Sequence, residues 1–304
     1  MNNLPFSLPG RFYRGNLHAH STRSDGRLEP AVVVEAYRAE GYDFLALTDH
    51  FMARYGNQVT DTRDLRGPGF TTILGAELHG PALENGGLWH LVAVGLPLDF
   101  PADGLDEPGP SLATRAVAAG AFVGIAHPAW NGVTIADARS VPDAHAIEIH
   151  NEGHTRDSDR GGGWYLADVL ATRGRRFSTF AADDAHFGER PDRFGGWVQV
   201  RAEALEPVAL VAALKAGHYY STQGPELRHV AVADGELRIS CSPVEAIYVG
   251  GPGQLCRWAR DEAGQGLTGA AFPMAAFMGG FCRVTVLDTA GKRAWTNPIW
   301  LDAE

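Results

Sequence analysis

Short apolar runs alternate with amphipathic stretches through the first two thirds of the chain. Short apolar runs with polar ends are typical of buried strands, and apolar residues at three- and four-residue spacing are typical of helices. The pattern predicts strands at residues 13–17, 43–48, 70–75, 89–96, 121–126, 144–149, 177–182 and 197–201. It predicts helices at residues 28–40, 111–120, 164–172 and 206–216, where an early proline or a following glycine marks several ends.

Polar side chains stand where several of these strands end, namely at His50, Glu77, His127, Asp184 and His186. Repeated strand, polar tip and helix indicates an α/β fold, either a parallel barrel or a doubly wound sheet. The barrel is favoured, because a barrel gathers functional groups from the carboxyl ends of many strands at one rim.

The pattern changes from about residue 225 to short alternating runs separated by Gly, Pro and Asp turns. Runs at residues 237–240, 246–249, 283–287 and 297–301 predict antiparallel strands. We therefore expect two domains, a barrel at residues 1–224 and a small antiparallel β domain at residues 225–304.

Composition excludes or disfavours several classes of function. The 304 residues are 45% hydrophobic and carry a formal net charge of −10, which suits a folded protein and disfavours binding to long nucleic acid. No apolar run is long enough for a membrane span, and the start lacks the basic and apolar parts of a secretory signal. The three cysteines follow neither zinc nor redox spacing. These features predict a cytoplasmic protein with reduced thiols, and they leave its oligomeric state open.

The motif at residues 16–26 contains the first candidate metal ligands. His18 and His20 are two residues apart at the end of a predicted strand, so their side chains point to one face. Asp25 follows across a Ser-Asp-Gly turn that can bring its carboxylate back toward both rings. This is a chelating arrangement, although a His-x-His pair alone is weak support for a metal site.

The other donors strengthen that interpretation. Candidate ligands at strand ends or strand starts are His18, His20, Asp25, His50, Glu77, His90, His127, Asp184 and His186. All offer nitrogen or oxygen, which suits zinc, manganese or iron, and nine donors exceed the needs of one ion. A multinuclear site with a bridging carboxylate predicts hydrolysis.

Five ordered motifs resemble those of the PHP (polymerase and histidinol phosphatase) family. They are His18-Ala-His20 with Asp25, Thr48-Asp49-His50, Gly75-Ala76-Glu77, Ala126-His127-Pro128 and Asp183-Asp184-Ala185-His186. The segments 219–225 and 294–298 also resemble the carbaryl-hydrolase-like (CehA/McbA) branch.

The resemblance implies a distorted (β/α)7 TIM-like barrel with two or three divalent ions, manganese, zinc or iron. Carried over by position, His18, His20, Glu77 and Asp184 hold the first ion. Glu77 bridges to a second ion held by His90 and His127, with His79 as the competitor of His90. The third ion is held by Asp25, His50 and His186.

Residues beside this constellation are candidates for catalysis and substrate binding. Asp49 is the candidate catalytic carboxylate, with the alternative that it orients a ligating histidine. Loop residues that could contact an anionic substrate are Arg23, Arg54, Asn151, His154 and Arg156.

The leading hypothesis is a metal-dependent phosphoesterase that attacks a small phosphorylated molecule or short nucleotide with a metal-bound hydroxide. The alternative is a carbamate, ester or amide hydrolase, because both reactions use hydroxide attack and metal stabilisation of an oxyanion. A third hypothesis is an inactive barrel that serves as a binding module, which the full set of polar ligands disfavours.

Overall fold

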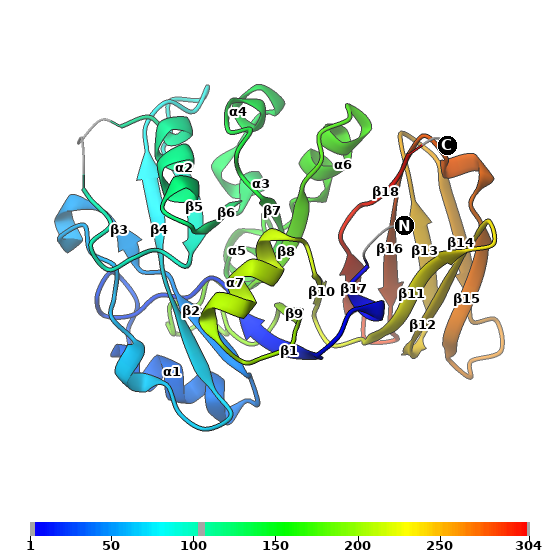
Figure 1. Ribbon diagram of the computed structural model, residues 1–304, viewed down its shortest axis with the longest axis horizontal. Coiled ribbons are helices and arrows are strands. Elements are labelled where there is room, and N and C mark those ends of the chain that lie inside the picture. The colour runs from blue at the N-terminus through cyan, green and yellow to red at the C-terminus, as the bar shows by residue number, and fades with distance from the viewer. Residues whose placement is uncertain (1–3, 103–106, 303–304) are drawn as a thin grey trace.

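Strands and helices alternate from Arg11 to Thr222 in the computed structural model, which describes residues 4–102 and 107–302 (Figure 1). The strands of this part are β1 (Arg11–Asn16), β2 (Phe44–Leu47), β3 (His50–Phe51), β4 (Thr71–Gly80), β5 (Trp89–Val94), β6 (Phe122–Ile125), β7 (Ala146–Asn151), β8 (Ser178–Ala182), β9 (Trp197–Ala202) and β10 (Tyr219–Thr222). The α-helices are α1 (Pro30–Ala39), α2 (Gly109–Ala118), α3 (Pro128–Asn131), α4 (Ile135–Ser140), α5 (Glu152–Ser158), α6 (Trp164–Thr172) and α7 (Pro207–Lys215). Single 3₁₀ turns occur at η1 (Pro5–Ser7), η2 (Ala53–Tyr55) and η3 (Arg63–Leu65).

These strands form one mixed sheet in the order β10-β9-β1-β2-β4-β5-β6-β7-β8. The pairs β1–β2, β2–β4, β6–β7 and β7–β8 are parallel, as predicted. The expectation of a wholly parallel sheet is wrong at β5, which is antiparallel to β4 and β6, and at β9, which is antiparallel to β1 and β10. Because β5 runs backwards, its first residues lie at the rim where β4 ends.

The sheet curls so that β8 comes to lie beside β9 and β10. Ser221 of β10 bridges to β8, since its Oγ accepts from the Ala181 backbone N–H at 3.1 Å and donates to the Thr179 carbonyl at 3.3 Å. No backbone ladder joins β8 to β9 or β10 in the described residues. The α/β class is confirmed, and closure into a seven-stranded barrel stays a prediction.

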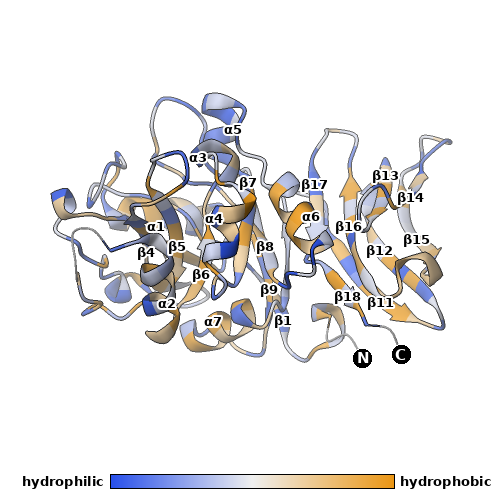
Figure 2. Cartoon of the chain, turned by 90° about the horizontal axis from the view of Figure 1, so that it is seen from above, coloured by the Kyte–Doolittle hydropathy of each residue, from blue (hydrophilic) through white to orange (hydrophobic). Residues whose placement is uncertain are grey.

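Aromatic and branched side chains fill the space that the sheet encloses. Phe44, Phe122 and Phe180 are fully buried in one apolar cluster with residues of β5 and β9. Gly15 makes room for the Phe44 ring, because a Cβ at residue 15 would lie 2.1 Å from that ring. Helices α1, α2, α6 and α7 pack on the outside of the strands, and Figure 2 shows the hydrophobic colour on those central strands.

The rest of the chain is antiparallel. Its strands are β11 (Leu227–Ala233), β12 (Glu236–Val244), β13 (Ala246–Gly250), β14 (Cys256–Arg260), β15 (Leu267–Pro273), β16 (Gly280–Leu287), β17 (Arg293–Thr296) and β18 (Ile299–Leu301), with the 3₁₀ turn η4 (Ala275–Phe277). Strands β11, β12 and β15 form a separate three-stranded sheet, and the others extend the large sheet through pairing of β17 with β10.

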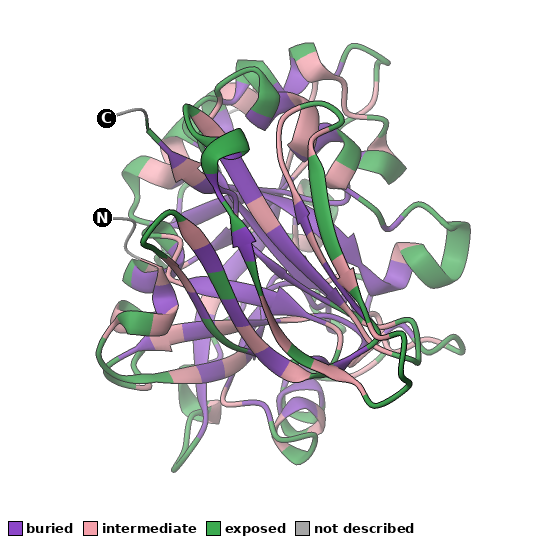
Figure 3. Cartoon of the chain, turned by 90° about the vertical axis from the view of Figure 1, so that its right-hand side faces the viewer, coloured by how far each residue is buried: buried purple, intermediate pink, exposed green. Residues whose placement is uncertain are grey.

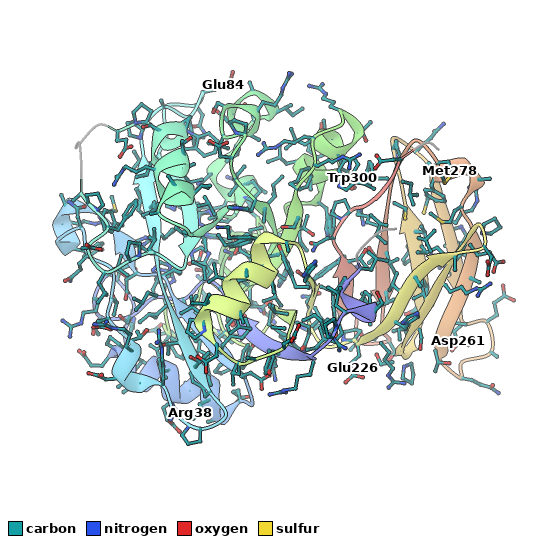
Figure 4. The ribbon with its side chains drawn as sticks, in the orientation of Figure 1. Arg38, Glu84, Glu226, Asp261, Met278 and Trp300 are labelled. Carbon is teal, nitrogen blue, oxygen red and sulfur yellow. The ribbon has the colours of Figure 1, made fainter. Side chains whose placement is uncertain are left out.

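An apolar cluster of its own lies between these two layers, and it includes Leu227, Ile247, Phe277 and Val284. Figure 3 shows the strand segments that this packing buries, and Figure 4 labels Met278 and Asp261 in the same part of the chain. A boundary between domains at residue 225 stays a prediction. Within the described residues, none of the helices has the length and apolar character that a membrane crossing needs.

Candidate metal centre

The loop after β1 places the first two histidines. The Asn16 side chain accepts from the His18 backbone N–H at 2.9 Å, and the His20 backbone N–H donates to the Ala185 carbonyl at 2.9 Å. Both imidazoles are wholly buried, with ring centroids 5.2 Å apart. The predicted convergence of His18 and His20 is present.

Glu77 is the central carboxylate of the site. Its Oε1 lies 2.8 Å from His90 Nδ1 and 3.1 Å from His127 Nε2. Its Oε2 lies 2.6 Å from His50 Nδ1, because β3 and β4 pair in parallel with His50 opposite Glu77. His90 reaches this rim because antiparallel β5 sets it opposite His79.

Asp184 is the second carboxylate of the site and follows β8 with a left-handed φ of 57°. Its Oδ1 lies 3.0 Å from His20 Nε2 and 3.2 Å from His18 Nε2. Asp25 sits farther out, with its oxygens 3.2 Å from His50 Nε2 and 3.3 Å from His186 Nε2.

All nine sequence-predicted donors enter groups whose ligand atoms lie within 4.8 Å of one another. The groups in the described residues are His20, Asp25, His50 and His186; His18, His127 and Asp184; His18, His20 and Glu77; Glu77, His90 and His127; and His50, Glu77 and His79. Only the last contains a residue that the sequence offered as a competitor. The structure places His79 on the Oε2 side of Glu77 and His90 on the Oε1 side, so the two occupy different positions.

The clustering perturbs the pKa values of these groups. Burial disfavours ionised His18, but the carboxylates of Asp184, Glu148 and Glu77 outweigh burial and raise its pKa well above the ordinary value. Burial also opposes charge on His50, yet Asp25 and Glu77 raise its pKa to about 10. The surrounding histidines depress the pKa of Glu77 well below its usual range in spite of burial.

Divalent cations fit this donor set. Buried side-chain atoms without a hydrogen-bond partner in the described residues include His18 Nε2, Glu77 Oε2 and His127 Nδ1. Unsatisfied buried polar atoms are costly, and nitrogen and carboxylate oxygen are the donors that zinc, manganese and iron accept. All three residues belong to the donor groups, and the lack of a partner at His18 Nε2 and Glu77 Oε2 fits a cation site.

Glu148 is a supporting residue that the sequence reasoning missed. This fully buried carboxylate of β7 has Oε1 3.2 Å from His18 Nδ1, and its Oε2 accepts from the His127 backbone N–H at 2.6 Å. A lone Glu inside the apolar run of residues 146–149 is the signal that could have revealed it.

Asn151 was expected to contact substrate, and the structure corrects this. Its side chain is buried and donates to Glu148 and Asp184, both at 3.1 Å. Its Oδ1 caps α5 by accepting from the His154 backbone N–H at 2.8 Å. Asn151 thus positions the carboxylates and leaves no side-chain atom for a substrate.

Asp49 is also corrected as a catalytic candidate. Its two oxygens accept from the Ser21 backbone N–H at 2.7 Å and from three hydroxyl groups, those of Ser21, Ser24 and Thr60, at 2.7–2.8 Å. The carboxylate is buried, does not line the pocket over the donors, and forms no hydrogen bond or ion pair with a histidine in the described residues. Asp49 holds the loop that carries His20 and Asp25.

A pocket of about 580 Å³ opens over the donors. His154 lines it as predicted, with its Nε2 3.3 Å from Asp184 Oδ2, and its ring stacks on Trp130 at 4.3 Å. Burial lowers the pKa of His154 to about 4.

The predicted arginines do not line this pocket. Arg23 borders a different depression, Arg54 lies over the Tyr55 ring at 4.7 Å, and Arg156 pairs with Glu152 at 2.7 Å. The turn at Ser24–Gly26 instead directs Arg27 toward the pocket, where its backbone N–H donates to the His186 carbonyl. Arg190 also lines the pocket and pairs with Asp157 at 2.7 Å. Their closeness in sequence to Asp25 and His186 was the available signal.

Comparison with solved structures finds a protein of similar architecture. A two-domain protein from Bacteroides vulgatus that contains a predicted PHP-like metal-dependent phosphoesterase superposes with a TM-score of 0.52 at 15% identity, over 98% of this chain and 99% of that chain. The chain has a PHP-like fold. The PHP resemblance of the sequence motifs is thereby confirmed at the level of the fold, while the CehA/McbA-like branch stays a prediction.

Two other solved structures superpose on this chain with TM-scores below 0.5. An inferred metal-dependent phosphoesterase from Bifidobacterium adolescentis has a TM-score of 0.40 and 14% identity, over 58% of this chain and 89% of that chain. An amidohydrolase from Chromobacterium violaceum, with bound sulfate and no metal, has a TM-score of 0.43 and 17% identity, over 67% and 96%. No family model matches the sequence, and no curated protein is significantly similar to it.

Proposed function

We propose that this PHP-like chain is a metal-dependent phosphoesterase that hydrolyses a small phosphorylated molecule or a short nucleotide at a multinuclear centre. The observation that carries the proposal is the clustering of nine nitrogen and oxygen donors, Glu77 and Asp184 among them, at an open pocket of about 580 Å³. Two or three ions of manganese, zinc or iron suit such a donor set.

Two carboxylates of the chain, Glu77 and Asp184, would hold these ions together with the histidines around them. Glu77 offers one oxygen to His90 and His127 and the other to the His50 side, which suits a bridging carboxylate. Asp184 serves His18 and His20. Divalent ions bound there would lower the pKa of water and polarise a phosphoryl oxygen.

Buried hydrogen-bond partners orient the histidine rings for metal binding. Glu148 accepts at His18 Nδ1, so the Nε2 lone pair of that ring faces Glu77 and Asp184. Asn151 holds Glu148 and Asp184 in one network. Such partners fix the ring tautomer and reduce the reorganisation that ligand binding requires.

Arg27 and Arg190 are our candidates for binding the substrate's anionic group. They stand on the pocket wall among acidic residues, and a guanidinium matches phosphate oxygens in two parallel hydrogen bonds. Arg190 is held by Asp157, so its position is partly set before a substrate arrives.

A carbamate, ester or amide hydrolase is the second candidate. The observation in its favour is Trp130, which is 40% exposed and lines the pocket beside His127. An exposed indole can pack against an aryl group of a carbamate as readily as against a nucleobase.

The deciding experiment assays the zinc- and manganese-loaded protein on matched panels of phosphomonoesters, phosphodiesters and aryl carbamates. We expect phosphoester turnover that a chelator abolishes and metal restores. Asp184→Ala should remove turnover while the thermal unfolding curve stays cooperative, and Asp261→Ala in the turn after β14 serves as the matched control. Turnover of carbamates alone would refute the phosphoesterase proposal, and turnover of nothing by a metal-loaded protein would favour an inactive binding module.

We also propose that residues 1–224 form the seven-stranded barrel and residues 225–304 a small β domain, in a cytoplasmic protein. The apolar cluster that includes Leu227 and Val284 supports this division, because most of its buried residues come from positions after 225, with Tyr220 of β10 as the exception.

A further inference from the structure

His79 is a buried histidine at the rim that the ligand set implied by the PHP resemblance does not use. It lies on β4 two residues after Glu77, so both side chains project from the same face of the strand. The His79 side chain is 4% exposed, and that of Glu77 is 1% exposed. Sequence position alone made it a rival of His90, but the two rings, whose centroids are 4.2 Å apart, face different oxygens of the Glu77 carboxylate.

Three donor atoms meet on the Oε2 side of Glu77. His79 Nε2 lies 2.8 Å from His50 Nδ1 and 3.6 Å from Glu77 Oε2, and His50 Nδ1 lies 2.6 Å from the same oxygen. We propose that His79, His50 and Glu77 form a cation position in addition to those that His18, His127 and Asp184 would serve. Two imidazole nitrogens and one carboxylate oxygen form a donor set that Zn²⁺ commonly accepts.

The far side of the His79 ring shows what this role would require of the second ring nitrogen. His79 Nδ1 is buried and has no hydrogen-bond partner in the described residues, and the ring borders a cavity of about 220 Å³ that Asn57 and Glu107 also line. A ligating histidine keeps its proton on the nitrogen opposite the metal and donates it to a carboxylate, a carbonyl or a water. His79 Nδ1 itself has almost no solvent-accessible surface, so the ring would have to shift slightly to donate to a water in this cavity.

Glu77 Oε2 gives a second reason. This buried carboxylate oxygen accepts no hydrogen bond of acceptable geometry in the described residues, although three histidines surround it. A cation between Oε2 and His79 Nε2 would satisfy the oxygen and both facing ring nitrogens together. A plain histidine–histidine hydrogen bond would satisfy only the rings.

His50 belongs to two donor groups through its two nitrogens. Its Nε2 faces Asp25 in the outer group with His186, and its Nδ1 faces Glu77 and His79 in the inner group. A neutral imidazole has one lone pair for a metal, so the two positions compete for His50. A test of the inner position therefore needs a protein in which the outer one has been removed.

The experiment counts tightly bound Zn²⁺ per full-length chain by elemental analysis after dialysis, and measures affinity by competition with a chromogenic chelator. The outer position is removed with Asp25→Asn and His186→Gln together, and His79→Gln is then added. We expect the His79 change to lose one zinc equivalent from that background. His229→Gln, which alters an exposed histidine of β11, is the matched control and should lose none.

Cooperative thermal unfolding of each metal-free variant confirms that it is folded, and His79→Asn replaces His79→Gln if the latter is not. As a second readout, the visible spectrum of the cobalt-substituted protein should lose intensity with His79→Gln. Unchanged zinc count, affinity and cobalt spectrum would overturn the inference and leave His79 as a hydrogen-bond partner of His50.

This inference rests on the metal-binding part of the proposed function. Zinc-free wild-type protein would overturn both, whereas zinc binding without phosphoester turnover would overturn only the proposed reaction.

Discussion

Replacing Glu148 by Gln tests how far the centre depends on a residue that touches no substrate. The substitution keeps size and shape but removes one negative charge and gives one end of the group two N–H donors. Glu148 Oε2 accepts from the His127 backbone N–H at 2.6 Å and from Asn151 Nδ2 at 3.1 Å, so the amide oxygen must occupy that side. The amide nitrogen then faces His18 Nδ1.

This placement reverses the His18 tautomer. His18 Nδ1 must accept from the Gln amide, so its proton moves to Nε2, the atom that lies 3.2 Å from Asp184 and 3.7 Å from Glu77. A protonated Nε2 has no lone pair for a metal. Changes in such supporting partners typically cost 10–100-fold in metal affinity or activity, which is about 1.4–2.7 kcal/mol.

The assay is zinc affinity by chelator competition together with kcat/KM on the best phosphoester. We expect Glu148→Gln to weaken zinc by about 10–100-fold and to lower kcat/KM by a similar factor. Glu236→Gln, which alters a partly exposed carboxylate of β12 outside the metal centre, should change neither quantity. Wild-type zinc affinity in Glu148→Gln, in a protein with a normal unfolding transition, would refute the argument that Glu148 sets the His18 tautomer.

Four further predictions address protonation and packing. Asp25 outweighs the effect of burial on two neighbouring rings and raises the pKa of His50 to about 10 and that of His186 to about 9. Zinc uptake at pH 7 should therefore release protons from these rings. Calorimetry in buffers of different ionisation enthalpy measures this release, and zero release would contradict the prediction. Since the folded pKa of both rings exceeds the unfolded value of about 6.5, their contribution to the stability of the metal-free protein is complete below about pH 6.5 and is lost toward pH 9–10, which urea titrations at pH 6 and pH 10 would detect. Asp49→Asn should cost about 1.5–3 kcal/mol in the free energy of unfolding, because it weakens hydrogen bonds to an ionised acceptor, and an unchanged urea midpoint would argue against that role. Gly15→Ala should cost about 1–3 kcal/mol or more, since the new Cβ would lie 2.1 Å from the Phe44 ring, and wild-type stability would show that the ring can move.

The strands and helices could be predicted from the sequence because their signals are local. Apolar runs bounded by polar tips located β2, β6, β8 and β9 to within about two residues, and the pattern around residues 164–172 gave α6 with its observed bounds. The direction of a strand within the sheet, by contrast, has no local sequence signal. The reversed β5 follows from where the chain turns between residues 81 and 88, which no apolar pattern encodes.

The candidate ligands could be predicted from the sequence because their spacing reflects strand geometry and resembles known motifs. His18, His20 and Glu77 stand at or near strand ends, where side chains from several strands can meet. The predictions of pocket arginines were wrong because the direction of a loop side chain depends on the three-dimensional fold. Arg23 and Arg27 flank one turn, and only the fold decides which of them faces the pocket.

The sequence by itself thus determined the class of elements and the set of donor atoms, because periodicity and motif spacing are properties of short segments. The tertiary structure alone decided that Glu148 supports His18, that Asn151 and Asp49 are enclosed by hydrogen bonds, and that His79 faces His50. Those relations join segments up to 130 residues apart, and packing of one curled sheet, rather than any local preference, sets the distances between them.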